Sequence, residues 1–160
     1  MLIAVDAQDF LAMLKCYSAQ VRRDRRLVAE DVLTSTVQSP RLCGSRLTLD
    51  AVIEAGRVRA LGYRVRACSL GQATTAIAAE RVVGMNANDL QAVQDEMERI
   101  LAGEVPDEDV LIWPELAIFQ HSAGMPARHG SALLPFLALQ ELFIANERRA
   151  RLTTQEIQHG

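Results

Sequence analysis

The sequence is poor in cysteine, lysine and aromatic side chains. Its 160 residues include 3 cysteines, and aromatic residues make up 4% of the chain. An odd, small number of cysteines without a C-x-x-C pair argues against a disulfide framework and fits a reducing, cytoplasmic location. Metal binding, thiol chemistry and simple burial all stay open for these residues. Lys15 is the only lysine, so arginine carries almost all of the positive charge.

The sequence lacks the characteristic features of several functional classes. No apolar run is long enough to cross a bilayer, and the first residues lack the basic lead and cleavage site of a signal peptide. The net charge of −3 gives no overall positive field that would attract nucleic acid. The chain has no glycine-rich phosphate loop and no G-x-S-x-G elbow. We therefore expect no enzyme, no membrane contact and no nucleic-acid partner.

The hydrophobic pattern is that of one α+β domain. The apolar fraction of 49% over 160 residues is enough for a single core, so we expect one domain over 1–160 with a loose C-terminal tail from about residue 152. Alternating apolar residues predict a meander of three antiparallel strands, at residues 30–39, 45–56 and 56–67. Helical spacing predicts helices on either side of these strands, at residues 7–22, 69–84, 86–104 and 131–151. Gly62 interrupts the third strand and suggests a bulge.

Arginines gather in two parts of the sequence. The segment "RRDRR" spans residues 22–26, and four arginines alternate along the third predicted strand, at positions 57, 59, 64 and 66. Solvated charge is the favoured interpretation of both groups, and an acidic partner is the alternative.

Two of the cysteines stand at strand ends that should meet. Cys43 precedes the second strand in "PRLCGSRLTLD" (40–50), and Cys68 follows the third strand in "VRACSLGQATTAI" (65–77). In an antiparallel meander these ends lie on the same side of the sheet. Cys68 also begins a helix, where free backbone N–H groups favour the thiolate form. Cys16 lies beside the apolar stripe of the first helix, and burial is its favoured interpretation.

These two segments, together with "MPARHGSALLPFLAL" (125–139), resemble the sulfur-bearing segments of the NifU/IscU family of iron–sulfur cluster assembly scaffolds. The last segment is most similar to the SufU-like branch, and the resemblance extends from about Tyr17 to Leu142. It implies a small three-stranded antiparallel sheet with helices packed on one face. It also implies that three cysteines, with an aspartate that follows the first Cys-Gly, converge on a cluster or a zinc ion.

The chain departs from this family pattern at two ligand positions. Ser45 replaces the aspartate, and the third cysteine falls on Ser131, or on Gly130 after a shift of one residue. The metal ligands that the resemblance implies are therefore Cys43 and Cys68. The imidazole of His129 is either a third ligand or a helix-start side chain that hydrogen bonds locally. Ser45 and Ser131 would line the site without binding metal tightly. Two thiolates and one imidazole could hold zinc, whereas a cluster would need thiols from a second chain.

The resemblance implies an iron–sulfur cluster assembly scaffold-like protein that carries metal or sulfur transiently on two cysteines. Its cofactor would be an iron–sulfur cluster, zinc or none, and Cys68 would be the persulfide carrier. Its partners would be a cysteine desulfurase or other iron–sulfur assembly proteins, and a homo-oligomer is open. The alternative is a degenerate family member that binds no metal and acts as an interaction or regulatory module.

Overall fold

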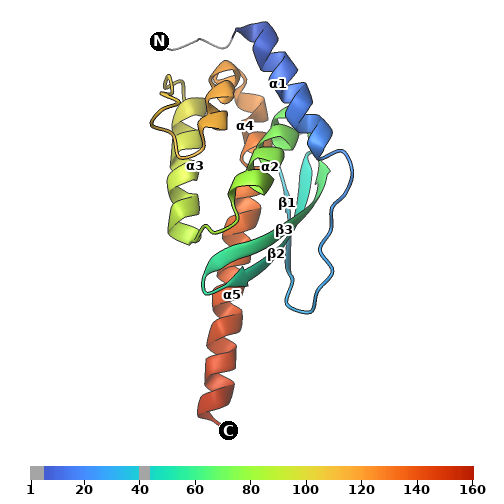
Figure 1. The fold of residues 1–160 in the computed structure, drawn as a ribbon, viewed down its shortest axis with the longest axis vertical. Coiled ribbons are helices and arrows are strands. Elements are labelled where there is room, and N and C mark those ends of the chain that lie inside the picture. Colours follow the sequence, from blue (N-terminus) through green and yellow to red (C-terminus); the bar gives the residue numbers. More distant parts are fainter. Residues whose placement is uncertain (1–5, 40–43) are drawn as a thin grey trace.

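The computed structural model describes residues 6–39 and 44–160. Helix α1 (Ala7–Gln20) leads into an antiparallel sheet, and the remaining helices pack against the sheet and one another (Figure 1). The strands are β1 (Leu33–Gln38), β2 (Arg46–Glu54) and β3 (Arg57–Arg66). The later elements are α2 (Ser69–Arg81), α3 (Ala87–Leu101), the 3₁₀ segment η1 (Pro114–Ser122), α4 (Pro126–Ala132) and α5 (Leu134–Gln158). The expected α+β fold with a three-stranded antiparallel sheet is confirmed.

The sheet is a meander in the order β1-β2-β3, and its two faces differ in character. Its inner face carries the buried side chains of β2, which are Leu47, Leu49, Ala51 and Ile53. Helix α5 contacts β1 and β2 on this side. The pairing register of β2 and β3 shifts between Val52 and Ile53, so the bulge lies at that point.

Gly62 does not form the bulge that the sequence suggested. It pairs with Asp50 within the regular ladder, and the segment that links α1 to β1 crosses directly over it. A Cβ atom on Gly62 would lie 2.6 Å from the carbonyl oxygen of Arg25 and 2.8 Å from the amide nitrogen of Leu27. Glycine is therefore required because another backbone passes within contact distance.

Asp50 fastens this crossing segment to the outer face of the sheet. Its side chain is 1% exposed and accepts two hydrogen bonds from Arg26, at 2.6 and 2.9 Å. The hydroxyl of Thr34 and the amide of Leu27 also donate to it, at 2.7 and 3.1 Å. One carboxylate thus joins the crossing segment, β1 and β2.

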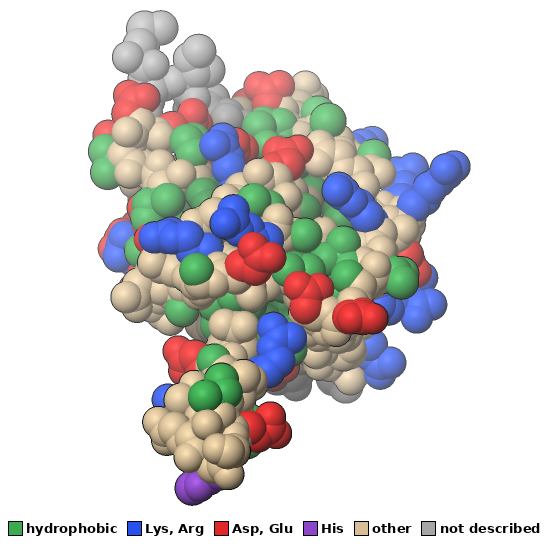
Figure 2. All heavy atoms as spheres, turned by 60° about the horizontal axis from the view of Figure 1, so that its bottom comes forward, with side chains coloured by type: hydrophobic (Ala, Val, Ile, Leu, Met, Phe, Trp, Pro, Cys, Tyr) green, Lys and Arg blue, Asp and Glu red, His purple; other side chains and the backbone are tan. Residues whose placement is uncertain are grey.

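The first part of α5 belongs to the core, and its second part stands clear of it. Buried residues of α5 extend from Leu134 to Phe143, and the helix then projects beyond the sheet (Figure 1). Figure 2 shows this end separated from the main body, with few hydrophobic side chains. Within the described residues, no helix has the length and hydropathy needed to cross a bilayer.

The segment from about residue 152, expected to be a loose tail, is the exposed end of α5 as far as Gln158. No proline or glycine interrupts it, and Thr153 and Thr154 donate hydrogen bonds to carbonyl oxygens one turn earlier, each at 3.0 Å. The sequence-based boundary was wrong because the helix loses its apolar pattern without ending.

Replacement of Asp50 by asparagine should destabilise the fold. Burial alone raises the pKa of Asp50, but the hydrogen bonds from Arg26, Thr34 and Leu27 prevail and hold it below its ordinary value of 3.8. The ionised carboxylate therefore stabilises the fold fully above that value, and this contribution is lost as the pH falls through the lower folded pKa. We expect Asp50→Asn to reduce the free energy of unfolding by about 1 to 3 kcal/mol at pH 7, measured by urea denaturation.

The difference in the free energy of unfolding between the wild type and Asp50→Asn should be smaller at pH 3 than at pH 7. Asp24→Asn removes the same charge at a solvated site, and it should change stability far less. An Asp50→Asn protein as stable as the wild type at pH 7 would contradict the role assigned to this carboxylate.

Candidate functional site

Three side chains that lie far apart in the sequence form one hydrogen-bonded group, called here the Ser45–Cys68–Ser131 cluster. The thiol of Cys68 donates to the Ser131 hydroxyl oxygen at 3.2 Å, and the Ser131 hydroxyl donates to Ser45 Oγ at 3.1 Å. The backbone amide of Cys68 also donates to Ser45 Oγ, at 3.3 Å. Both serines are buried, whereas Cys68 is only half-buried, so the thiol is the part of the cluster that reaches the surface.

The antiparallel pairing of β2 with β3 brings two of these residues together. Ser45 directly precedes β2, Cys68 follows β3 by two residues, and Arg46 pairs with Arg66 across the ladder. Gly44 has a φ of +65°, a left-handed conformation that glycine adopts without strain, and it turns the chain into β2. Cys68 is the N-cap residue of α2, and its side chain makes no capping hydrogen bond. Its sulfur is therefore directed toward Ser131 rather than to the helix backbone.

Gly71 leaves room for Ser131, the third residue of the cluster. The sequence analysis did not identify this role of Gly71. Ser131 lies on α4, which packs against α2. A Cβ atom on Gly71 would lie 2.5 Å from Ser131 Oγ and 2.9 Å from Ser131 O. No side chain other than hydrogen fits there while Ser131 contacts Cys68. The only signal in the sequence was a glycine within the first turn after a cysteine, in "CSLG".

The imidazole of His129 hydrogen bonds to a backbone carbonyl group. Its Nε2 lies 2.8 Å from the carbonyl oxygen of Ser122, a distance at which the ring nitrogen donates. The other ring nitrogen would have to serve a metal, so the ligand role of His129 stays a prediction. Cys43 lies outside the described residues, and its role as a ligand also stays a prediction.

The described donors do not by themselves suit a zinc ion or an iron–sulfur cluster. Between residues 6–39 and 44–160, no group of three His, Cys, Asp or Glu side chains could hold a metal ion. The cluster offers one thiol and two hydroxyls that hydrogen bond to one another, whereas structural zinc takes four nitrogen or sulfur donors and clusters take mainly thiolates.

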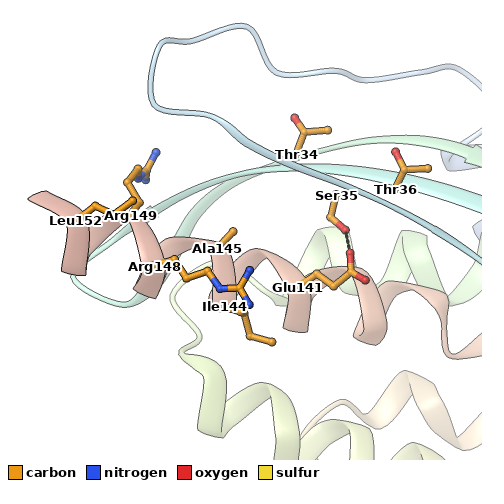
Figure 3. Close-up of a pocket in the computed structure, with 9 residues that line it drawn as sticks. All are labelled: Thr34, Ser35, Thr36, Glu141, Ile144, Ala145, Arg148, Arg149 and Leu152. Carbon is orange, nitrogen blue, oxygen red and sulfur yellow. Dashed lines mark hydrogen bonds between the residues drawn. The ribbon is translucent and has the colours of Figure 1, made fainter.

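A groove of about 720 Å³ lies elsewhere, between the edge strand β1 and the projecting part of α5 (Figure 3). Ser35 donates a hydrogen bond to Glu141 at its floor, and Ile144 and Arg148 line its helical side. None of the residues that line this groove belongs to the Ser45–Cys68–Ser131 cluster.

Restoration of the two replaced ligands should create a zinc site. Because the three positions already lie within hydrogen-bond distance, Ser45→Asp combined with Ser131→Cys would gather a carboxylate and two thiolates around one point. We expect this double variant to bind about one zinc per chain, measured by elemental analysis after dialysis against zinc.

The matched control adds Cys68→Ser to the double variant and should lose the zinc. Circular dichroism would establish that both variants are folded. A folded double variant without zinc would contradict the convergence of the three positions.

Comparisons with known proteins find solved structures that share this fold. No family model and no curated protein matches the sequence. The crystal structure of the N-terminal part of a nitrogen-fixing NifU-like protein from Brucella abortus is similar at a TM-score of 0.76 and 29% identity, over 89% of this chain and 99% of that one. A second similar structure is a putative iron–sulfur cluster assembly scaffold protein for the SUF system from Fervidobacterium islandicum AW-1. It has a TM-score of 0.66 and 20% identity over 82% of this chain and 93% of that one, a level that supports the shared fold.

The resemblance seen in the sequence is thus confirmed by the fold, over most of the length of both chains. The elements appear in the expected order, with a first helix, the meander and then helices. The protein therefore has a NifU/IscU-like fold.

Proposed function

We propose that this protein serves iron–sulfur cluster assembly as a scaffold-like carrier, and that it accepts sulfur on Cys68 and hands it on. Its partners would be a cysteine desulfurase or other assembly proteins of the cytoplasm. It would turn over no small-molecule substrate and so would not be an enzyme. The observation that carries this proposal is the half-buried Cys68 at the N-terminus of α2, whose thiol donates to the hydroxyl of Ser131 and whose backbone amide donates to that of Ser45.

The similar structures support the assembly role. One of them is described as a nitrogen-fixing NifU-like protein and the other as a putative iron–sulfur cluster assembly scaffold protein for the SUF system. The likeness to the first extends over 89% of this chain.

The proposed transfer is an exchange between a persulfide and a thiol. The Cys68 sulfur attacks the outer sulfur of the persulfide on the desulfurase, and a new S–S bond forms on Cys68. The S–S bond of the donor breaks, and its cysteine leaves as a thiolate that takes up the proton lost by Cys68. No external oxidant or reductant is consumed. The attacking form is the thiolate, so Cys68 must give up the proton that it donates to Ser131.

Metal or cluster would be cargo in this account and not a resident group. One chain would offer Cys43 and Cys68, so two chains, or one chain and a partner's thiols, would be needed for the four ligands of a cluster. A homo-oligomer in which two such sites face each other would meet this need.

The serine replacements also favour a second candidate. A family member that has lost both an aspartate and a cysteine ligand could act as an interaction or regulatory module without metal or sulfur. Because such a module would need no reactive thiol, sulfur transfer to Cys68 separates the two functions.

We expect sulfur from L-[³⁵S]cysteine to reach Cys68 when the protein is incubated with a cysteine desulfurase and its pyridoxal phosphate. The label should be retained on a non-reducing gel and released by dithiothreitol. Cys68→Ser should abolish most of it, because the attacking sulfur is gone.

Cys16→Ser is the matched control and should be labelled like the wild type. Cys16 lies on α1 outside the cluster, and it is exposed, so the burial expected from the sequence was wrong. Equal labelling of Cys68→Ser and the wild type, or no labelling of either, would overturn the carrier function and favour the interaction module.

A further inference from the structure

One face of α5 forms the helical side of the groove beside β1. Its residues recur every three or four positions, a spacing that places them on one side of a helix. We call this face the α5 stripe, and it consists of Leu137, Glu141, Ile144, Ala145, Arg148 and Leu152. All of them except Leu137 line the groove (Figure 3).

The α5 stripe leaves large apolar side chains in contact with water. Leu137, Ile144 and Leu152 are 37%, 50% and 62% exposed, and they lie seven and eight residues apart. Apolar residues at this spacing are typical of a helix that packs against another helix. A helix that projects from the core also gains most of its stability from such packing. The stripe therefore has the character of a contact surface.

The order of residues along the stripe is self-complementary. Glu141 lies three residues before Ile144, and Arg148 lies three residues after Ala145. Leu137 lies seven residues before Ile144, and Leu152 lies seven residues after Ala145. Two copies of the stripe that run antiparallel and are centred on Ile144 and Ala145 therefore match leucine with leucine and carboxylate with guanidinium.

The charged groups of the stripe are available for such a match. Arg148 is exposed and forms no ion pair within the described part of the chain. Glu141 is also exposed, and the hydrogen bond from Ser35 engages only its Oε2 atom. The neighbouring Arg149 is held within the chain by hydrogen bonds to Asp31 O and Asn146.

The charges also select the direction of the pairing. A parallel pair of stripes in the same register would set each Glu141 against another Glu141 and each Arg148 against another Arg148. Like charges that face each other across an interface are strongly unfavourable. An antiparallel pair turns both contacts into ion pairs.

We propose that the groove receives α5 of a second copy of this chain, and that two copies form a twofold dimer in which the α5 stripes pack antiparallel. Glu141 of each copy would bind Arg148 of the other, and the exposed leucines would cover each other. The contact is of the self-complementary kind that closes a symmetric dimer. It would also cover the free edge of β1, which is an edge strand of the sheet.

This dimer would keep the two sulfur sites apart. Ser131 lies three residues before the start of α5 at Leu134. At 1.5 Å per residue, an antiparallel contact centred on Ile144 and Ala145 places the two helix starts roughly 30 Å from each other. The dimer thus differs from a homo-oligomer in which two sites share a cluster, and it does not depend on the proposed carrier function.

Sedimentation velocity should show a wild type with twice the mass of one chain. Arg148→Glu should raise the dissociation constant of the dimer about tenfold or more, because it sets two carboxylates against each other at both ends of the contact. Arg148→Glu combined with Glu141→Arg should restore the dimer, since the same two ion pairs form with their charges exchanged.

Two further variants separate the stripe from general effects. Arg59→Glu makes the same change in net charge on β3, at the opposite edge of the sheet from β1, and it should leave the dimer intact. Leu152→Ser removes an exposed apolar side chain without a change in charge, and it should weaken the dimer. Circular dichroism would establish that each variant is folded, as expected for substitutions at exposed positions.

The remaining outcomes overturn the inference. A wild type that stays monomeric up to about 1 mM protein would show that no second copy occupies the groove. A dimer that Arg148→Glu leaves unchanged would show that the copies meet elsewhere. A folded Glu141→Arg, Arg148→Glu variant that remains monomeric would show that the antiparallel pairing is wrong. None of these results bears on sulfur transfer to Cys68, which is measured separately.

Discussion

The site depends on the close approach of α4 to α2 at Gly71. Ser131 can contact Cys68 only because the helix that begins at Cys68 has no side chain at this position, where a Cβ atom would lie 2.5 Å from the serine hydroxyl. The pairing of β2 with β3 brings Ser45 to the same point from the other side. Two independent packing contacts thus converge on Cys68, one at its thiol and one at its backbone amide.

The chemistry at this point follows from the donors that the cluster offers. A site of thiolates and a carboxylate gathers negative charges that repel one another until a cation binds. Here a thiol and two hydroxyls satisfy each other by hydrogen bonds, and no such repulsion exists. The arrangement is suited to a sulfur that is picked up and released and less suited to a tightly bound ion.

Much of the fold could be predicted from the sequence, because the spacing of apolar residues shows which side of a strand or helix is buried. The three strands were predicted from the alternation of apolar residues, and α3 from its helical spacing. The closeness of Ser45 and Cys68 also follows from antiparallel topology. The roles of Gly62 and Gly71 could not be predicted, since each depends on a distant segment that passes over it. The end of α5 was missed because an exposed helix carries no apolar stripe.

The most direct test of the account is native mass spectrometry of the protein purified without oxygen, followed by mapping of modified cysteines. The account predicts a chain without stoichiometric metal, part of which carries one additional sulfur atom on the peptide that contains Cys68. One metal ion or cluster per chain, lost on Cys68→Ser, would contradict it, because the described donors would then hold resident metal after all.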